Sequence, residues 1–419
     1  MIVPAWINPA FHLLEGERRW DWPQIAELSE RIRAKLPVGG RIAVTGRSVG
    51  TLLATLIACE RARIEVVLLR GDAPRPAGAS VLIEADGRFA PLAPSVDTTN
   101  ECAVLMPTSG TSGAPKLVRH DLIRLMGRIR GGREPGARWL LAYEPTAFAG
   151  LQVLFSAVAA GATLIAEPGA APARLAELMV THQATHVSAP PSLWRCWLRL
   201  PDWSPPRLAM VTLGGEAADQ ALLDRLSRSF PGAKLRDIYA STEAGAVYSV
   251  RDGRAGFPAA WLDVGVDGVA LRIANGALEL RSPRAMLNYA GGEQRPYTTD
   301  GWLITGDLVE RVGDRVLFCG RVGDQVAIGG TKVAPEKVEH VLLGVPGVLE
   351  VLVGAVAQPG LGNVLGAAVV KAPGSDAGAL HVLIGRHTAA LLPAEQPRLI
   401  RFVDDIALAA SGKKARATT

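Results

Sequence analysis

The densest group of side chains with chemical potential lies at residues 107–116, Pro-Thr-Ser-Gly-Thr-Ser-Gly-Ala-Pro-Lys. It follows an apolar run at 103–106 that is typical of a buried strand. Glycines allow unusual backbone dihedrals and close approach of a ligand, and successive backbone N–H groups form a concave donor array that suits phosphate oxygens. The hydroxyl groups add donors and Lys116 adds a positive charge. The stretch is therefore predicted to be a loop that holds a polyphosphate.

Two other interpretations of this loop are weaker. It is not a P-loop of the GxxxxGK[ST] kind, because Lys116 comes too late after Gly113 and no Ser or Thr follows it. A flexible Gly/Ser linker would not need a lysine, and a buried strand would not run directly into it.

The elements around this loop alternate between strands and helices, which predicts parallel sheet. Ligands of open α/β sheets bind outside the carboxyl ends of the strands, so the polar loops 107–116 and 240–245 are expected to share one cleft. The helices expected before residue 256 cover 22–36, 49–60, 122–129, 151–160, 172–182 and 217–230. The strands expected there cover 41–45, 65–69, 103–106, 139–142, 163–165, 185–188, 208–213 and 235–239.

After residue 256 the pattern changes to short β-type runs with frequent Gly, Asp and Pro, which suggests antiparallel sheet. These runs are 269–273, 278–281 and 316–318. The last hundred residues are expected to form a compact unit with helices over 335–343 and 377–392 and strands over 348–356, 365–370 and 399–402. The predicted fold class is α/β: a large N-terminal domain of parallel-rich sheets with flanking helices and a β-rich section, followed by a small α+β C-terminal domain.

Composition narrows the function further. A chain of 419 residues is long for one core, and 48% hydrophobic with 20% charged residues fits a soluble globular protein. The net charge of +5 suits anionic small molecules or an acidic partner protein. Nucleic acid is not an expected partner, because no basic tract with interleaved aromatic residues is present.

The predicted compartment is the cytoplasm. The four cysteines form no CxxC pair, and each lies in an apolar context typical of a free buried thiol. The first twenty residues lack the basic start and apolar core of a signal peptide, and no apolar run approaches the length of a membrane span.

Five motifs follow one another along the chain: 108–116, 239–243 (Tyr-Ala-Ser-Thr-Glu), 305–307 (Thr-Gly-Asp), 320–321 (Gly-Arg) and 412–416 (Gly-Lys-Lys-Ala-Arg). With these motifs the sequence resembles, from about residue 40 onward, the adenylate-forming (AMP-binding) superfamily. That superfamily contains acyl- and aryl-CoA ligases, free-standing or modular adenylation domains, and luciferase. The resemblance implies an adenylation domain over 1–320 that binds ATP and an acid, a hinge over 321–324, and a mobile domain over 325–419 that carries the catalytic lysine.

The resemblance also implies residue roles. Tyr239 would stack on adenine, Asp307 would bind both ribose hydroxyls, and Arg321 would reach the ribose or a phosphate. Thr242 would contact the α-phosphate, Glu243 would hold Mg²⁺, and Lys413 would be the mobile catalytic lysine. The β- and γ-phosphates would be bound by Thr108, Ser109, Gly110, Thr111, Ser112, Gly113 and Lys116.

Several of these residues have plainer interpretations. Tyr239 is also typical of a core tyrosine at a strand end, and Asp307 of a turn. The pair Thr242 and Glu243 could be a helix N-cap with its first-turn acid. Lys413 could belong to a solvated basic tail. The spacing of Ser411 and Lys414 also fits the SxxK pattern of serine acyl-enzymes, although a place so near the terminus argues against a rigid nucleophile.

The implied reaction is ATP-dependent activation of a carboxylic acid to acyl-AMP, with release of pyrophosphate and then thioester formation with CoA. A flat or apolar acid, aryl or fatty, is expected from Phe148, Gly214, Gly215 and Ala240. An amino acid is disfavoured, because no carboxylate beside Phe148 would pair with its ammonium group.

The thiol is expected to pass Gly329 and Gly330. An acyl-carrier-protein ligase that loads a phosphopantetheine carrier is one alternative, and a non-catalytic or regulatory member of the fold is another. The sequence departs from the family pattern at Ala240, at Ala327 and at the hinge residue Gly323, where glycine eases backbone rotation.

Overall fold

The computed structural model describes residues 3–70, 78–92, 101–108, 116–129, 132, 134–290, 292, 296–359, 362–409 and 411–415. The predicted phosphate-loop residues Ser109, Gly110, Thr111, Ser112 and Gly113 lie outside these residues. Both ends of that loop, Thr108 and Lys116, lie within them.

The first sheet has seven strands in the order β18-β8-β7-β4-β3-β5-β6. Its centre is parallel, because β3 pairs in parallel with β4 and β5, and β4 with β7. Helices α1 (Trp22–Arg33) and α2 (Val49–Ala62) pack together beside it, and Ser48 caps α2 as its sequence position suggests. The strand bounds are β3 Arg41–Thr45, β4 Glu65–Leu69, β5 Val81–Ile83, β6 Phe89–Pro91, β7 Ala103–Thr108, β8 Lys116–His120 and β18 Asn288–Tyr289.

The second sheet has eight strands in the order β14-β13-β12-β11-β9-β10-β1-β2 and is parallel except at its two edges. Helix α4 (Phe148–Ala160) packs on one face through a core that includes Leu141 and Leu164. The opposite face is covered by α5 (Pro172–Thr181), α6 (Pro191–Trp197) and α7 (Gln220–Ser229). The strand bounds are β1 His12–Glu15, β2 Arg18–Trp20, β9 Arg138–Leu141, β10 Thr163–Ala166, β11 His186–Ala189, β12 Met210–Gly214, β13 Lys234–Ser241 and β14 Gly245–Val250.

The third sheet is antiparallel, as the short runs after residue 256 predict, and has the strand order β15-β20-β19-β17-β16. It packs against the aromatic side chains of β13 and β14. Its strands are β15 Phe257–Pro258, β16 Ala270–Ala274, β17 Ala277–Arg281, β19 Leu303–Val312 and β20 Arg315–Arg321. Two short helices, α3 (Leu122–Met126) and α8 (Trp261–Val264), complete the large N-terminal region.

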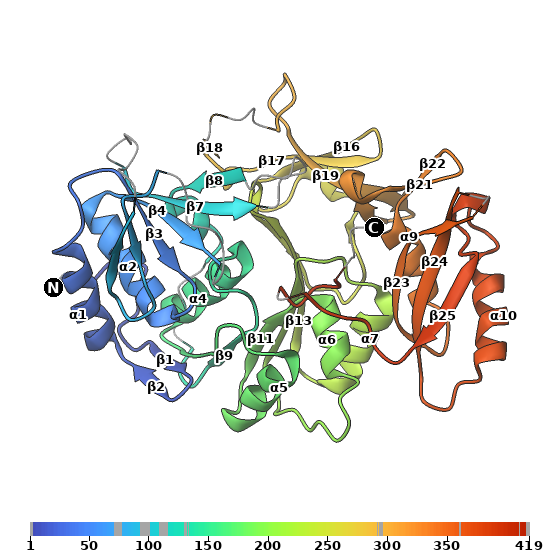
Figure 1. Ribbon diagram of the computed structural model, residues 1–419, viewed down its shortest axis with the longest axis horizontal. Helices are drawn as coiled ribbons and strands as arrows, with labels where there is room; N and C mark the ends of the chain where they lie inside the picture. The colour runs from blue at the N-terminus through green and yellow to red at the C-terminus, as the bar shows by residue number, and fades with distance from the viewer. Residues whose placement is uncertain are drawn as a thin grey trace.

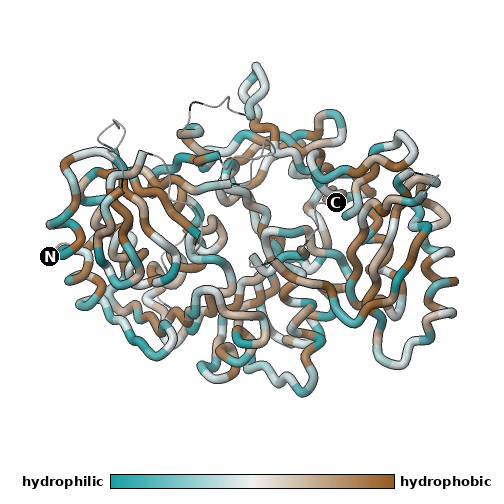
Figure 2. The backbone as a smooth tube through the Cα atoms, viewed as in Figure 1, coloured by the Kyte–Doolittle hydropathy of each residue, from teal (hydrophilic) through white to brown (hydrophobic). Residues whose placement is uncertain are grey.

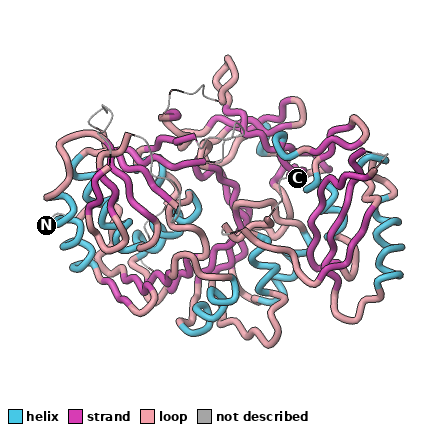
Figure 3. The backbone as a smooth tube through the Cα atoms, viewed as in Figure 1, coloured by secondary structure: helices cyan, strands magenta, loops and turns pink. Residues whose placement is uncertain are grey.

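The C-terminal region has its own hydrophobic core. A 3₁₀ turn, Val322–Asp324, leads from β20 into the hairpin β21 (Val326–Ile328) and β22 (Thr331–Val333). The three-stranded sheet β23 (Val348–Gln358), β24 (Gly362–Lys371) and β25 (Leu399–Val403) follows, with α9 (Pro335–Leu343) and α10 (Ala377–Thr388) and a 3₁₀ turn at Pro393–Glu395. Hydrophobic segments concentrate in its strands, and α10 covers its outer side (Figures 2 and 3).

The chain does not end in this C-terminal sheet. After β25 it turns back, and the dark red segment crosses to the region of β13 and α6 (Figure 1). This return places residues 411–415 against the N-terminal region. The order of the elements along the chain does not reveal this contact.

Most predicted elements are present, with shifted ends. Helix α4 begins at Phe148 rather than at residue 151, and α10 ends at Thr388 rather than at residue 392. Helix α6 and strands β1 and β14 were not predicted, because their short apolar segments lack a clear period.

Candidate active site

One large cleft, of about 2340 Å³, lies where the three N-terminal sheets meet the C-terminal region. The polar segments after β7 and β13, which were expected to share a cleft, both line it through Thr108 and Thr242. The other predicted site residues that line it are Lys116, Phe148, Gly214, Gly215, Tyr239, Ala240, Glu243, Asp307, Arg321 and Lys413. The structure therefore brings together residues that lie up to about three hundred positions apart.

The predicted phosphate loop is closed by a strand pair at its base. Thr108 pairs with Lys116 across β7 and β8, and the Thr108 hydroxyl donates to the Lys116 carbonyl at 3.4 Å. The Lys116 ammonium lies 5.1 Å from the centre of the Tyr289 ring. The hairpin therefore fixes both ends of the loop at the cleft.

Thr242 and Glu243 are held through their backbones. The carbonyl of Thr242 accepts a hydrogen bond from Nε2 of His120 at 2.6 Å, and the carbonyl of Glu243 accepts one from the backbone N–H of Met286. Burial lowers the pKa of His120 to about 4, so its ring is neutral at pH 7 and donates from Nε2. Both side chains are left to line the cleft.

Asp307 is the centre of a second polar group. Its carboxylate accepts hydrogen bonds from the Tyr239 hydroxyl and, at 2.7 Å, from Nε of Arg321. The Tyr239 ring lies against the rings of Tyr248 and Phe318, with centroid distances of 5.3 and 5.0 Å. Burial, reinforced by the Asp307 charge, raises the pKa of Tyr239, which therefore remains a hydroxyl donor.

Lys413 enters the cleft from the returning C-terminal segment. A Cβ atom at Gly215 would lie 3.5 Å from Nζ of Lys413, and Gly215 has a φ of +85°, so both space and backbone favour glycine there. Burial lowers the pKa of Lys413, and the Glu216 carboxylate partly opposes this shift. The ammonium thus reaches the predicted acid and phosphate side of the cleft.

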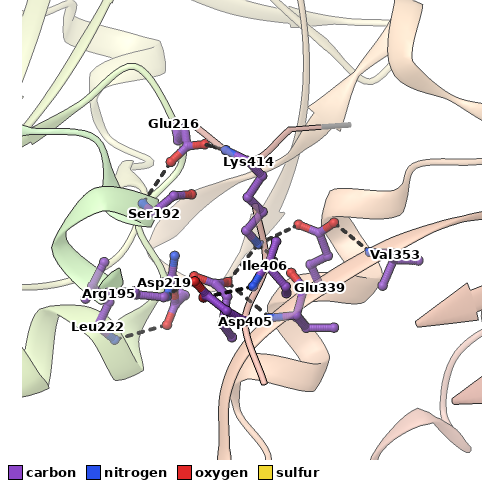
Figure 4. A network of polar contacts seen from close by, with 12 residues as sticks. Ser192, Arg195, Glu216, Asp219, Leu222, Glu339, Val353, Asp405, Ile406 and Lys414 are labelled. Atoms are coloured by element: carbon purple, nitrogen blue, oxygen red, sulfur yellow. Dashed lines mark hydrogen bonds and ion pairs between the residues drawn. The ribbon is translucent and has the colours of Figure 1, made fainter. Parts of the chain in front are cut away.

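The neighbouring Lys414 points the other way, into a buried ionic network (Figure 4). Its ammonium lies 3.0 Å from a carboxylate oxygen of Glu339 and of Glu350, and it donates to the Val351 carbonyl at 2.7 Å. Its backbone N–H reaches Glu216 in the N-terminal region at 3.3 Å, and Arg199 there pairs with Asp405. These contacts tie the last segment to both regions at once.

The residues predicted to line a thiol channel are not brought to this cleft. Gly329 and Gly330 form the turn between β21 and β22, where both are exposed and have positive φ. They are absent from the cleft lining, whereas Lys413 is part of it.

The end of the cleft that was predicted to bind the acid lies beside the first turn of α4. Phe148 is buried there, and the Tyr143 hydroxyl donates to the Gly214 carbonyl at 3.0 Å. Beyond Ala240 the lining turns polar with Ser188, Thr212, Arg236 and Ser249. These residues were not predicted from the sequence; the available signal was a polar side chain within each of the strands β11, β12, β13 and β14.

No helix within the described ranges is long and apolar enough to cross a membrane. The fold and the cleft place Lys413, which the C-terminal region carries, against residues of the N-terminal region. The model of the AMP-binding enzyme family matches residues 19–289, and that of the AMP-binding enzyme C-terminal domain matches residues 337–413. The chain belongs to the AMP-binding enzyme family.

The similar proteins described next are named as acid–thiol ligases. The medium/long-chain-fatty-acid–[acyl-carrier-protein] ligase FadD10 of Mycobacterium tuberculosis is 26% identical over 78% of this chain and 68% of its own length. The 3-hydroxybenzoate–CoA ligase of Aromatoleum sp. strain CIB is 27% identical over 85% of this chain and 73% of its own length. The fatty acid–[acyl-carrier-protein] ligase MmaC of Mycobacterium marinum is 34% identical, but over only 34% of this chain and 28% of its own length.

Solved structures share the fold. The anthranilate CoA ligase AuaEII, in complex with anthranoyl-AMP, has a TM-score of 0.78 at 19% identity. The alignment covers 96% of this chain and 92% of the ligase chain. ATP-bound MatB from Rhodopseudomonas palustris has a TM-score of 0.75 at 20% identity, and the alignment covers 97% of this chain and 94% of the MatB chain. Family and relatives together make this chain an AMP-forming acid–thiol ligase.

Proposed function

We propose that this protein condenses a carboxylic acid with ATP and then transfers the acyl group to a phosphopantetheine thiol. An oxygen of the acid attacks the α-phosphorus in line, the bond to the β-phosphate oxygen breaks, and pyrophosphate leaves. The thiol, having lost its proton, then attacks the acyl carbon, and AMP leaves with the electron pair of the broken acyl–oxygen bond. The observation that carries the proposal is the Lys413 ammonium, held beside Gly215 in the cleft that Asp307 and Glu243 also line.

The residues present suit ATP. The Asp307 carboxylate is an acceptor suited to two ribose hydroxyls, and Arg321 and Tyr239 already orient it. The chain would hold the polyphosphate with the loop closed by Thr108 and Lys116. Charge that develops on the phosphoryl oxygens would be stabilised by donors fixed in advance, among them Lys413 and the Thr242 hydroxyl.

Magnesium also suits the site. Among the described residues no hydrogen bond or ion pair involves the Glu243 carboxylate, and no cluster of three or more metal-binding side chains occurs. A single carboxylate is enough for Mg²⁺ when phosphate oxygens and water supply the other ligands. Glu243 would hold the ion, which would neutralise charge on the phosphates.

The acid is proposed to carry an apolar body, aryl or aliphatic, because buried Phe148 and the small residues Gly214, Gly215 and Ala240 form the entrance of its pocket. The thiol acceptor is proposed to be CoA, with an acyl-carrier protein as the second candidate that relatives such as FadD10 support. We place the reaction in the cytoplasm, because the four cysteines are free thiols.

Thioester formation would require a second arrangement of the C-terminal domain. Lys413 occupies the cleft while Gly329 and Gly330 are exposed outside it, an arrangement suited to adenylation. Rotation about residues 321–324, with Gly323 at their centre, would withdraw Lys413 and bring Gly329 and Gly330 to the acyl-adenylate.

The test is pyrophosphate release from Mg-ATP across aryl, fatty and amino acids, followed by thioester formation with CoA and with a carrier protein. We expect pyrophosphate release with an acid that carries an apolar body, and faster acyl transfer to CoA than to the carrier protein. A clear preference for amino acids would overturn the substrate class, and faster transfer to the carrier protein would favour the second candidate. No release with any acid would favour a non-catalytic role.

A further inference from the structure

The acid pocket continues past Ala240 along the face of the eight-stranded sheet that α4 partly covers. Over β9 and β10 this face is apolar and packs on α4. Over the neighbouring strands, residues in register share the face: Ser188 pairs with Thr212, and Thr212 pairs with Arg236. All three line the cleft. The far end of the pocket is therefore polar, in contrast to its entrance.

Arg236 lies at this far end, and its side chain is partly buried. Among the described residues no hydrogen bond or ion pair involves its guanidinium, and its Nε is buried without an acceptor. On the same face, the Ser249 hydroxyl on the adjacent strand β14 is also buried without a partner, as is the Trp139 indole N–H three strands away on β9. A buried donor without a partner is costly, so several together indicate an acceptor that arrives with a ligand.

The charge around Arg236 has the same sign. Arg128 and Arg251 also line the cleft, and burial together with the Arg251 charge lowers the pKa of Arg236, although the Glu134 carboxylate partly opposes this shift. Arg128 is already paired with Asp267, at 2.6 Å. The nearby carboxylate, Glu134, lies 3.2 Å from Nε2 of His186. The subsite thus carries more positive than negative charge.

We propose that Arg236 and Ser249 form a distal subsite for a second carboxylate, so that the preferred substrate is a dicarboxylic acid with an apolar middle. The proposal rests on the proposed function, because the first carboxylate must meet Lys413. Ala240 lies four positions after Arg236 on β13, which is roughly 13 Å along an extended strand. A substrate would therefore span the pocket with its reacting carboxylate near Gly215 and its second carboxylate at Arg236.

The test compares acids that differ only at the far end. Each straight-chain dicarboxylic acid from four to ten carbons is paired with the monocarboxylic acid of equal length, and 4-(carboxymethyl)benzoate is paired with 4-ethylbenzoate. We expect kcat/KM for pyrophosphate release to favour one or more diacids by about 10- to 100-fold, the usual worth of hydrogen bonds to a charged group. A uniform preference for the monoacids would overturn the distal subsite while supporting the proposed function.

Variants of Arg236 assign the preference to this residue. Arg236→Met should lose the diacid preference while leaving the monoacids within a few-fold, and Arg236→Glu should shift the preference toward ω-amino acids of the same length. Arg228→Met, which changes an exposed arginine of α7, is the control and should match the unaltered protein. Equal loss on mono- and diacids in Arg236→Met, with no shift in Arg236→Glu, would overturn the proposal.

A binding measurement separates this proposal from the proposed function. Thermal stabilisation by millimolar diacid without ATP should occur in the unaltered protein and be absent in Arg236→Met. Stabilisation without pyrophosphate release from any acid would support the subsite and overturn the adenylation activity. Equal stabilisation of both proteins would contradict a role for Arg236.

Discussion

At the scale of single residues, Lys413 stands apart because its ammonium belongs to one domain and its surroundings to the other. Its position beside Gly215 depends on a backbone conformation that glycine adopts readily. Asp307 and Glu243 reach the same cleft from β19 and from the end of β13. In the sequence, each of these side chains could have an ordinary structural role. Only their proximity in the folded chain suggests a shared chemical function.

Replacing Lys413 by Ala should slow adenylation by about 10²–10³, because one preorganised cation is removed from the developing charge. Thioester formation from supplied acyl-adenylate should survive, because Lys413 is not needed for that step in the proposed mechanism. The two half-reactions are measured separately, by pyrophosphate release and by thioester formation. An equal loss in both would contradict the assignment.

The lowered pKa of Lys413 predicts a pH limit on adenylation. The charged ammonium is the active form, so the rate should fall as pH rises through a pKa below the ordinary lysine value of about 10.4. A profile of kcat/KM for pyrophosphate release against pH measures this limb. Lys413→Arg, whose charge persists, should move the limb upward; an unchanged limb would show that another group titrates.

At the scale of elements, α4 shapes the proposed acid pocket, because Phe148 and Gln152 line the cleft from this helix. The helix begins immediately after the turn at Glu144, and Gly150 fits closely against that turn. A Cβ atom at Gly150 would lie 2.1 Å from the Glu144 carbonyl oxygen, far closer than packed atoms approach. The position of α4 therefore requires glycine, which has no side chain, at residue 150.

Gly150→Ala should destabilise the protein by about 1–3 kcal/mol, the usual cost of overpacking, and should weaken acid binding by moving α4. Urea unfolding and KM for the acid measure the two effects. Gly385→Ala in α10 is the matched control, because nothing lies within 4 Å of its added Cβ, and alanine favours a helix. If both variants had the same stability, the close approach at Gly150 would be unimportant.

At the scale of the whole molecule, the ionic network around Lys414 holds the two domains in the arrangement that places Lys413 in the cleft. Glu339 and Glu350 are almost fully buried, and the Lys414 ammonium lies 3.0 Å from a carboxylate oxygen of each, whereas Arg195 and Arg199 lie 3.9 Å from Glu350. A buried charge that loses its partner is costly. Lys414 is thus a positioning residue for Lys413.

Lys414→Met should lower stability by about 3–5 kcal/mol and slow adenylation more than thioester formation from supplied acyl-adenylate. Adding Glu350→Gln should recover part of both losses, because it removes the uncompensated charge, and a double-mutant cycle measures the coupling. Lys371→Met is the control, since Lys371 contacts a carbonyl, of Ser375, at 3.0 Å. Additive effects of the two substitutions would argue against the network.

The sequence by itself determined the alternation of strands and helices, the antiparallel section after residue 256 and the order of the motifs. These features are local: they depend on the period of apolar residues and on glycines at strand ends, which a short window of sequence contains. The positions of Tyr239, Asp307 and Lys413 could be chosen from that order and from the family resemblance.

Only the tertiary structure decided which side chains meet. That Lys413 lies in the cleft while Lys414 turns to Glu339 depends on the chain's return from β25 to α6. The place of Arg236 at the far end of the cleft, with its Nε buried and without an acceptor among the described residues, depends on the register of β12 and β13 and on where α4 stops covering the sheet. Such contacts join residues far apart in the chain, and each is fixed by how strands pair and domains pack rather than by the residues beside it.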